Sequence, residues 1–139
     1  MNAAELIAEI ERLHAVIVGW TTGALPADAR VFAPFADALL PGFTLINPDG
    51  RTEDRAAVVD RFRARHGGRA GRDFRIEIQW SGVCARGPDW GLVRYDELWW
   101  EGTELTASIR GSALLRSGAA ATGTPAGIGW QHLHKTWVA

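Results

Sequence analysis

The spacing of hydrophobic residues changes near residue 73. Before that point, apolar residues recur at steps of three and four, which is the period of an amphipathic helix. This spacing predicts helices over residues 3–21, 27–40 and 53–66, with a short strand at 43–46 between the last two. After that point, apolar and polar residues alternate, as in a half-buried strand. The alternation predicts four long strands, the first beginning at 73 and the others covering 90–101, 104–116 and 128–138.

Residues at the helix ends refine these boundaries. Asn2 can cap the first helix, and Glu5, three residues later, completes a capping-box pattern. Gly23 suits the left-handed backbone position that commonly ends a helix. Pro34 is expected to kink or split the second helix, which we expect to end at the turn signal Pro41-Gly42.

The order of the elements predicts a single α+β domain over residues 1–139. Helices grouped ahead of an antiparallel meander favour a fold in which the helices cover one face of a curved sheet. Strands of ten or more residues are longer than usual. Such strands favour a strongly bent sheet that half-encloses a cavity.

Composition narrows the classes of function. The net charge of −1 argues against a nucleic-acid binder with a strong positive field. No apolar run approaches the ~20 residues of a membrane helix. Cys84 is the only cysteine, so an intrachain disulfide is excluded. These features predict a cytoplasmic protein that contacts neither nucleic acid nor membrane, and they indicate no cofactor.

The last predicted strand carries the most distinctive side chains. Successive residues of a strand point to opposite faces, so Trp130, His132, His134 and Thr136 are expected to share one face. Two imidazoles and an indole on one face suggest the wall of a polar and aromatic cavity.

The hairpin at Gly102-Thr103 adds residues from two more strands to this wall. With a two-residue turn, Glu97 lies opposite Ser108, and Tyr95 lies opposite Arg110. The candidate ligand-binding residues are therefore Tyr95, Glu97, Trp99, Arg110, Ser112, Trp130, His132 and His134. The opposite face of the hairpin is drier. If no helix covers that face, it exposes an apolar patch, which predicts a homodimer through the sheet.

Several roles are open for the charged members of this wall. His132 and His134 can act as general acid and base, or they can be hydrogen-bonded residues of the cavity wall. A metal site would need further ligands, and Glu97 is the only acidic candidate nearby, so no metal is predicted. Glu97 with Arg110 is either a ligand anchor or a structural ion pair. Tyr95 either donates to an oxyanion or simply finds a buried partner.

Four segments of the chain resemble the NTF2-like superfamily, and within it the SnoaL-like, DUF4440-type group of small bacterial proteins. Phe43–Arg51 is similar to that group's strand and PDG turn, and Leu92–Glu97 to its "LVRYEE" strand. Arg110–Arg116 resembles its "RxSALxR" strand, and Trp130–Trp137 its "WxHxHxTW" terminus. The resemblance implies a conical pocket between sheet and helices, and dimerisation through the sheet.

Three functional hypotheses follow from the cavity and the resemblance. The first is a binding protein for a small, partly apolar ligand whose carboxylate or carbonyl faces Arg110. The second is an enzyme of the isomerase, dehydratase or cyclase type, in which His132 or His134 transfers a proton. Glu97 orients the histidine in this hypothesis, and Tyr95 or Arg110 stabilises developing negative charge. The third is a non-catalytic oligomerisation or interaction domain.

Overall fold

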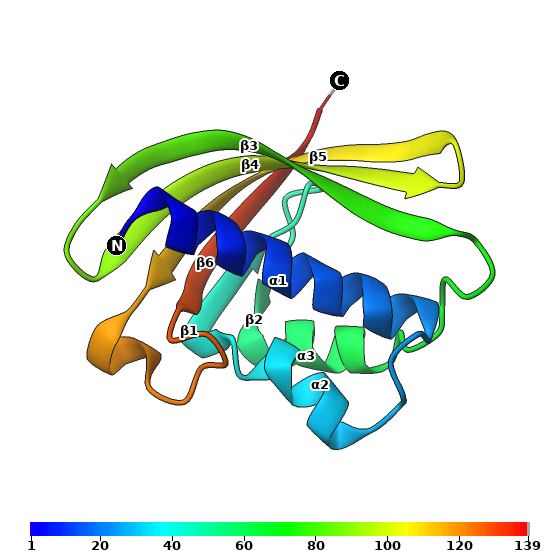
Figure 1. The fold of residues 1–139 in the computed structure, drawn as a ribbon, viewed down its shortest axis with the longest axis horizontal. Coiled ribbons are helices and arrows are strands. Elements are labelled where there is room, and N and C mark those ends of the chain that lie inside the picture. The colour runs from blue at the N-terminus through cyan, green and yellow to red at the C-terminus, as the bar shows by residue number, and fades with distance from the viewer. Residues whose placement is uncertain (139) are drawn as a thin grey trace.

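Three α-helices lie beneath one face of a curved, six-stranded sheet in the computed structural model, which describes residues 1–138 (Figure 1). The helices are α1 (Ala3–Thr22), α2 (Ala29–Ala36) and α3 (Arg55–Arg63). No helix within the described residues combines the length and apolar character needed to cross a membrane. The predicted α+β architecture is confirmed.

Helix α1 is the helix that the sequence predicts best. Asn2 and Glu5 form the capping box, and Gly23 ends the helix with a φ of 78°. Its buried positions repeat at steps of three and four, so one stripe of the helix faces the sheet. Those positions are Leu6, Glu9, Ile10, Leu13, His14, Trp20 and Thr21.

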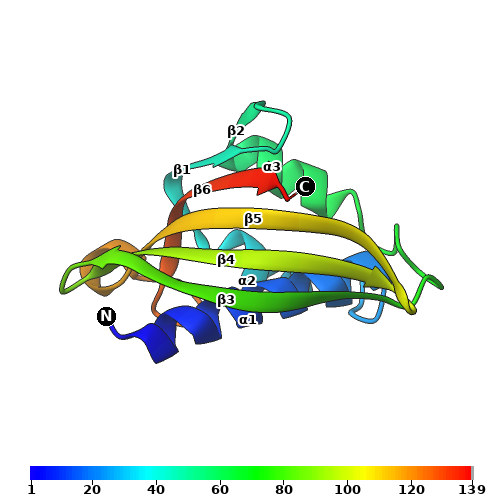
Figure 2. The same cartoon turned by 90° about the horizontal axis from the view of Figure 1, so that it is seen from above.

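The sheet contains both parallel and antiparallel pairs. Its strands, in the order β2-β1-β6-β5-β4-β3, lie side by side in Figure 2. Strand β1 runs parallel to β6, and every other neighbouring pair is antiparallel. The strands are β1 (Leu39–Ile46), β2 (Thr52–Asp54), β3 (Phe74–Arg86), β4 (Trp90–Glu101), β5 (Glu104–Arg116) and β6 (Gly129–Trp137).

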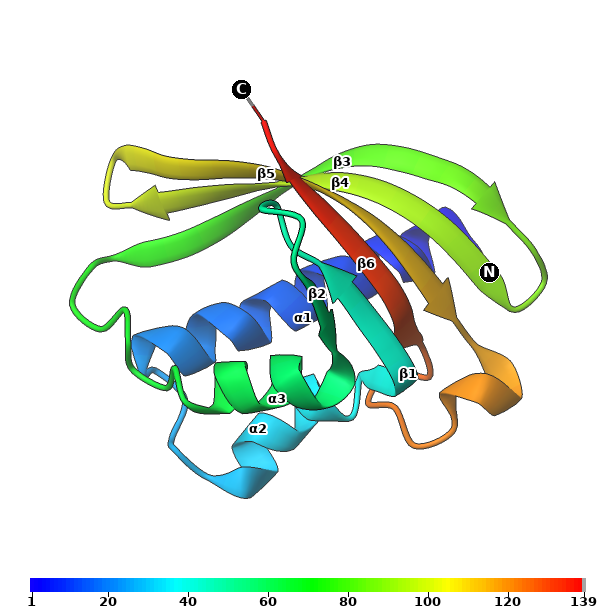
Figure 3. The same ribbon diagram turned by 180° about the vertical axis from the view of Figure 1, so that it is seen from behind.

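The region between residues 27 and 66 departs from the predicted boundaries. Helix α2 ends at Ala36 rather than at residue 40, and Leu39 and Leu40 belong to β1 instead. The turn signal Pro41-Gly42 lies inside β1, where the register against β6 shifts, because a bulge tolerates proline and glycine. The short strand β2 was not predicted. Helix α3 lies beside β1 and β2 (Figure 3).

Two register shifts decide which side chains face the helices. In the β4–β5 hairpin, Trp100 pairs with Leu105 but Trp99 pairs with Ala107, so Thr106 is an extra residue. In the β5–β6 pair, Leu115 pairs with Trp130 but Leu114 pairs with His132, so Gln131 is extra. Each bulge exchanges the two faces of the strand beyond it.

The hydrophobic core fills the space between α1 and the inner face of the sheet. Leu6, Ile10 and Leu13 of α1 meet Val93 and Tyr95 of β4. Residues of β5 and β6 complete this layer: Ala113, Leu115, Trp130 and Leu133. The same core continues between the helices through Trp20, Phe32 and Phe35, and a cavity opens beside it.

Candidate functional site

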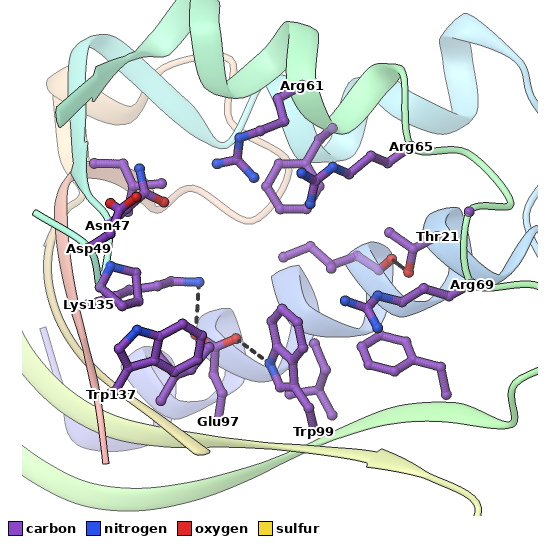
Figure 4. A pocket seen from close by; sticks show the side chains of 18 of the residues that line it. Thr21, Asn47, Asp49, Arg61, Arg65, Arg69, Glu97, Trp99, Lys135 and Trp137 are labelled. Atoms are coloured by element: carbon purple, nitrogen blue, oxygen red, sulfur yellow. Dashed lines mark hydrogen bonds and ion pairs between the residues drawn. The ribbon is translucent and has the colours of Figure 1, made fainter. Parts of the chain in front are cut away.

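A cavity of about 500 Å³ opens between the sheet and the helices (Figure 4). One wall is formed by the end of α1 and by α3 with the loop that follows it. The other wall is the inner face of the sheet, and the turn after β1 closes one side. Apolar side chains from all of these elements line the cavity: Ile17, Leu45, Phe62, Phe74, Ile76, Trp99, Ile109 and Trp137.

Glu97 of β4 lies at the base of the cavity, and its side chain is almost fully buried. Its Oε1 accepts a hydrogen bond from the indole of Trp99 at 3.2 Å and lies 3.3 Å from Nε2 of His14. Its Oε2 lies 2.9 Å from the ammonium of Lys135. Burial alone would raise the pKa of Glu97, but Lys135 and His14 hold it well below its usual value. The carboxylate is therefore ionised and is a weak base.

His14 connects this carboxylate to α1. Its Nδ1 donates to the carbonyl oxygen of Ile10 at 2.7 Å, because a carbonyl can only accept. Its ring also packs edge-on against Tyr95, with ring centres 5.4 Å apart. The Tyr95 hydroxyl is buried and has no hydrogen-bond partner within residues 1–138. Burial, and then the charge of Glu97, raise the pKa of Tyr95, so this phenol stays protonated.

Arg69 lies on the opposite wall, in the loop after α3. Its guanidinium carbon is 4.4 Å from the ring centre of Phe74 and 4.8 Å from that of Trp99. Its nearest carboxylate oxygen, on Glu101, is 3.7 Å away. Burial lowers the pKa of Arg69, Glu101 opposes this effect, and the neighbouring charges of Arg72 and Arg65 add to it.

Arg61 of α3 is held more firmly. It donates hydrogen bonds of 3.1 and 2.8 Å to the two carboxylate oxygens of Glu53. Asn47 donates to the same carboxylate at 2.8 Å. The Arg61 hydrogen bond outweighs burial, so the pKa of Glu53 is lowered. This cluster fixes the turn after β1 against α3 at the rim of the cavity.

The structure divides the eight predicted cavity residues between two faces. Tyr95, Glu97, Trp99 and Trp130 point inward, and of these Glu97 and Trp99 line the cavity. The other four lie on the outer face, so their predicted position in the cavity is wrong: Arg110, Ser112, His132 and His134. The bulges at Thr106 and Gln131 are the physical reason.

The outer-face residues have partners of their own. Arg110 donates hydrogen bonds of 2.8 and 3.0 Å to Asp96, not to Glu97. Nδ1 of His132 is 2.6 Å from the hydroxyl of Thr44. Ser112 lies opposite the exposed His134. Glu97 is thus on the opposite side of the sheet from both histidines and cannot complete a metal site with them.

Trp130 lies inside the core rather than in the cavity wall. It is fully buried, and its indole donates to Oε1 of Glu9 at 3.0 Å. The same carboxylate accepts two hydrogen bonds from Arg12, at 2.8 and 2.7 Å. Within residues 1–138, no group of three or more His, Cys, Asp and Glu side chains is arranged to hold a metal ion.

The basic residues of the cavity were not predicted from the sequence. Arg61, Arg65, Arg69 and Arg72 lie close together in the sequence, but only Arg61 belongs to α3 and the others lie in the turns that follow it. This cluster of arginines was a readable signal. Lys135 and Trp137 were assigned to the wrong face of β6 by the same bulge that moved the histidines outward.

Comparison with known proteins supports the fold. No family model matches this chain, and a search of curated proteins returns no match. An NTF2-like protein of unknown function from Pseudomonas aeruginosa is 24% identical with a TM-score of 0.83, over 97% of this chain and 99% of its own. ActVI-ORFA from Streptomyces coelicolor is 15% identical with a TM-score of 0.63, over 96% and 95%.

A third solved structure is a protein from Streptomyces avermitilis, provisionally described as a dehydratase of the NTF2-like family. It is 15% identical with a TM-score of 0.56, over 78% of this chain and 82% of its own. The chain therefore has the NTF2-like fold, as its sequence resemblance predicted. One fold hosts many activities, so the site must carry the functional argument.

Proposed function

We propose that this protein binds a small, partly apolar ligand in the cavity beneath its curved sheet. The observation that carries this proposal is the cavity itself, whose volume of about 500 Å³ is lined by aromatic and aliphatic side chains with a few charged groups. Pockets that bind small molecules combine these features and fall in the range of ~300–1,000 Å³. Assignment to the SnoaL-like, DUF4440-type group and a cytoplasmic location are further parts of the proposal, supported by the four motifs and the single cysteine.

Binding is better supported than proton transfer. The predicted proton-transfer residues, His132 and His134, do not line the cavity. Glu97 does line it, but its neighbours keep the carboxylate ionised, and one of its oxygens is paired with the ammonium of Lys135. General acid–base catalysis needs a titratable group that faces the substrate and is poised near the working pH. We therefore propose no catalytic residue.

A thermal-shift screen of small carboxylates, carbonyls and steroid-like compounds tests the binding function. A ligand at 100 times its dissociation constant is expected to stabilise the fold by about 2.7 kcal/mol. Ile76→Trp fills the cavity from β3 and should abolish the shift, whereas Gln79→Trp places the same side chain on the exposed outer face of that strand and should not. Equal shifts in both variants would place the ligand elsewhere, and no shift with any compound would favour the assembly hypothesis.

We propose that two copies of the chain associate through the outer face of the sheet. The helices leave this face uncovered (Figures 1 and 2), and half-buried Leu92, Leu98 and Trp100 lie on it between charged residues. A two-fold contact of this kind pairs one patch with its own copy.

Size-exclusion chromatography with light scattering should therefore give a dimer at micromolar concentration. Leu98→Glu places a charge in the middle of the patch and should shift the protein toward the monomer. Ala56→Glu, which places the same charge on the exposed surface of α3 and away from the sheet's outer face, is the control. A monomeric wild-type protein would contradict the proposal.

A further inference from the structure

The cavity gathers positive charge in a chain whose net charge is −1. Among the described residues that line it, six are basic, whereas Asp49 and Glu97 are acidic. The basic ones are Arg51, Arg61, Arg65, Arg69, Arg72 and Lys135. Even when the nearby Glu53 and Glu101 are included, positive charges outnumber negative ones. The surplus indicates a negatively charged occupant.

The surplus is concentrated at one end of the cavity. Arg61 and Lys135 each have a carboxylate within 2.9 Å. Arg69 and Arg72 share the single carboxylate of Glu101, at 3.7 and 3.6 Å. The side chain of Arg65 makes no hydrogen bond or ion pair with any residue in 1–138. In Figure 4, Arg65 and Arg69 both extend toward the open centre of the cavity.

Arg69 is the arginine of this group whose guanidinium is best positioned to bind an anion. Its guanidinium packs against the rings of Phe74 and Trp99, which shield it from water and restrict its movement. Its lowered pKa reports burial that nearby carboxylates do not fully offset. Contact with aromatic rings uses none of the N–H donors of a guanidinium, and two of these donors match the two oxygens of a carboxylate or a phosphate.

We propose that the ligand of this cavity is a small organic anion, whose acid group binds Arg69 and Arg65 and whose flat apolar body lies against Trp99 and Ile76. This inference rests on the proposed binding function and specifies the chemical class of the ligand. The acid group is an oxyanion, either a carboxylate or a phosphate monoester. Glu97 and Lys135 at the base of the cavity neutralise each other, so this end offers an acid group no surplus of positive charge and the reverse orientation is disfavoured.

Isothermal titration calorimetry with three probes of similar shape tests the inference: 2-naphthoate, 2-naphthyl phosphate and the neutral 2-naphthamide. At low salt, at least one anion should bind, and the amide should bind at least about tenfold more weakly because it lacks a charge-assisted contact. Whichever anion binds more tightly identifies the acid group. Raising the salt concentration should weaken the binding of the anion and leave the affinity of the amide unchanged.

Variants locate the contact. Arg69→Gln should lower the affinity for the anion by at least about tenfold without changing the affinity for the amide. Arg69→Lys should recover part of that loss, because it restores the charge but not the planar fork. Arg63→Gln removes an exposed arginine of α3 that pairs with Asp60 and does not line the cavity, and it should bind like the wild type. If Arg69→Gln fails to fold, Arg65→Gln carries the same test, because Arg65 is exposed.

Failure of this inference can be separated from failure of the binding function. If the amide binds as tightly as the anions and Arg69→Gln changes neither, the ligand class is wrong. Ile76→Trp then decides whether the probes occupy the cavity at all. If neither anion binds saturably at millimolar concentration, the inference is overturned, and the wider thermal-shift screen decides the binding function independently.

Discussion

Replacing Glu97 by alanine is expected to destabilise the fold by about 3 to 5 kcal/mol, because removing one partner of a buried ion pair leaves the other uncompensated. Glu97 is 1% exposed, and the side chain of Lys135, 2.9 Å away, is 15% exposed. Lys135 and His14 would both lose the carboxylate that they face. Such a loss is a large part of the stability of an ordinary domain, about 5–15 kcal/mol. Urea unfolding followed by circular dichroism measures it.

A double-mutant cycle separates the energy of the interaction between Glu97 and Lys135 from the effect of the volume that their side chains fill. Glu97→Met and Lys135→Met should each destabilise the protein strongly, because each leaves one buried charge. The double variant should be less destabilised than the sum of the two, since replacing a whole ion pair by apolar side chains is often neutral. Additive losses would mean that the two charges do not stabilise one another.

Acid provides a second measurement on the same group. The pKa of Glu97 in the folded protein lies well below its usual value of 4.5. The unfolded chain therefore takes up a proton near pH 4.5 while the folded protein does not, so this stabilising contribution is complete above that pH and is lost as the pH falls below it. The Glu97→Gln variant has no ionised carboxylate at this position and lacks this stabilisation at every pH. The difference in unfolding free energy between the wild type and this variant should therefore narrow below pH 4.5. A constant difference would show that the carboxylate is not held ionised.

Local signals in the sequence were enough to predict the helices and the long strands. The capping box at Asn2 and Glu5 and the glycine at position 23 mark the ends of α1 to within one residue. The hairpin turn Gly102-Thr103 separates β4 from β5 as predicted. These features depend on neighbours in the sequence, so periodicity and capping chemistry are sufficient to find them.

The face on which each strand residue lies was less predictable, because neither bulge interrupts the alternation of apolar and polar residues in the sequence. Thr106 and Gln131 are polar residues that fit either face, so an extra residue at those positions does not disturb the pattern of apolar and polar side chains. A shift of one residue then reverses every assignment beyond it. Glu97 and Trp99 were placed correctly in the cavity, whereas Arg110 and His132 were not.

The residues that give the cavity its charge come from far apart in the chain. Arg69 and Lys135 meet there because α3 and its loop fold over the inner face of the sheet. The side-chain pattern of one strand does not depend on which helix lies opposite it. The arginines between residues 61 and 72 were visible, but only the fold shows that they share a cavity with Trp99 and Glu97.

Replacing Trp130 by alanine is expected to be as damaging as the loss of Glu97, at about 3 to 5 kcal/mol. Trp130 is fully buried, and its backbone N–H donates to the carbonyl of Ala38 at 2.8 Å, which joins β6 to the chain just ahead of β1. Removing the indole opens a cavity in the centre of the core and takes one hydrogen bond from Glu9. The midpoint of urea unfolding should fall while its slope stays constant.

Two further substitutions show which part of Trp130 matters. Trp130→Phe keeps an aromatic ring but loses the N–H donor. Because Arg12 still donates to the same oxygen of Glu9, the change should cost only about 1.5–3 kcal/mol, the range for one hydrogen bond to a charged group. Trp137→Ala removes the same side chain from the same strand, but this residue is 60% exposed, and the loss should stay near 0.5 kcal/mol, as at ordinary surface positions. Trp137 lines the cavity, so its removal should weaken ligand binding more than stability. If Trp137→Ala destabilised the fold as much as Trp130→Ala, the division of β6 into a core end and a cavity end would be wrong.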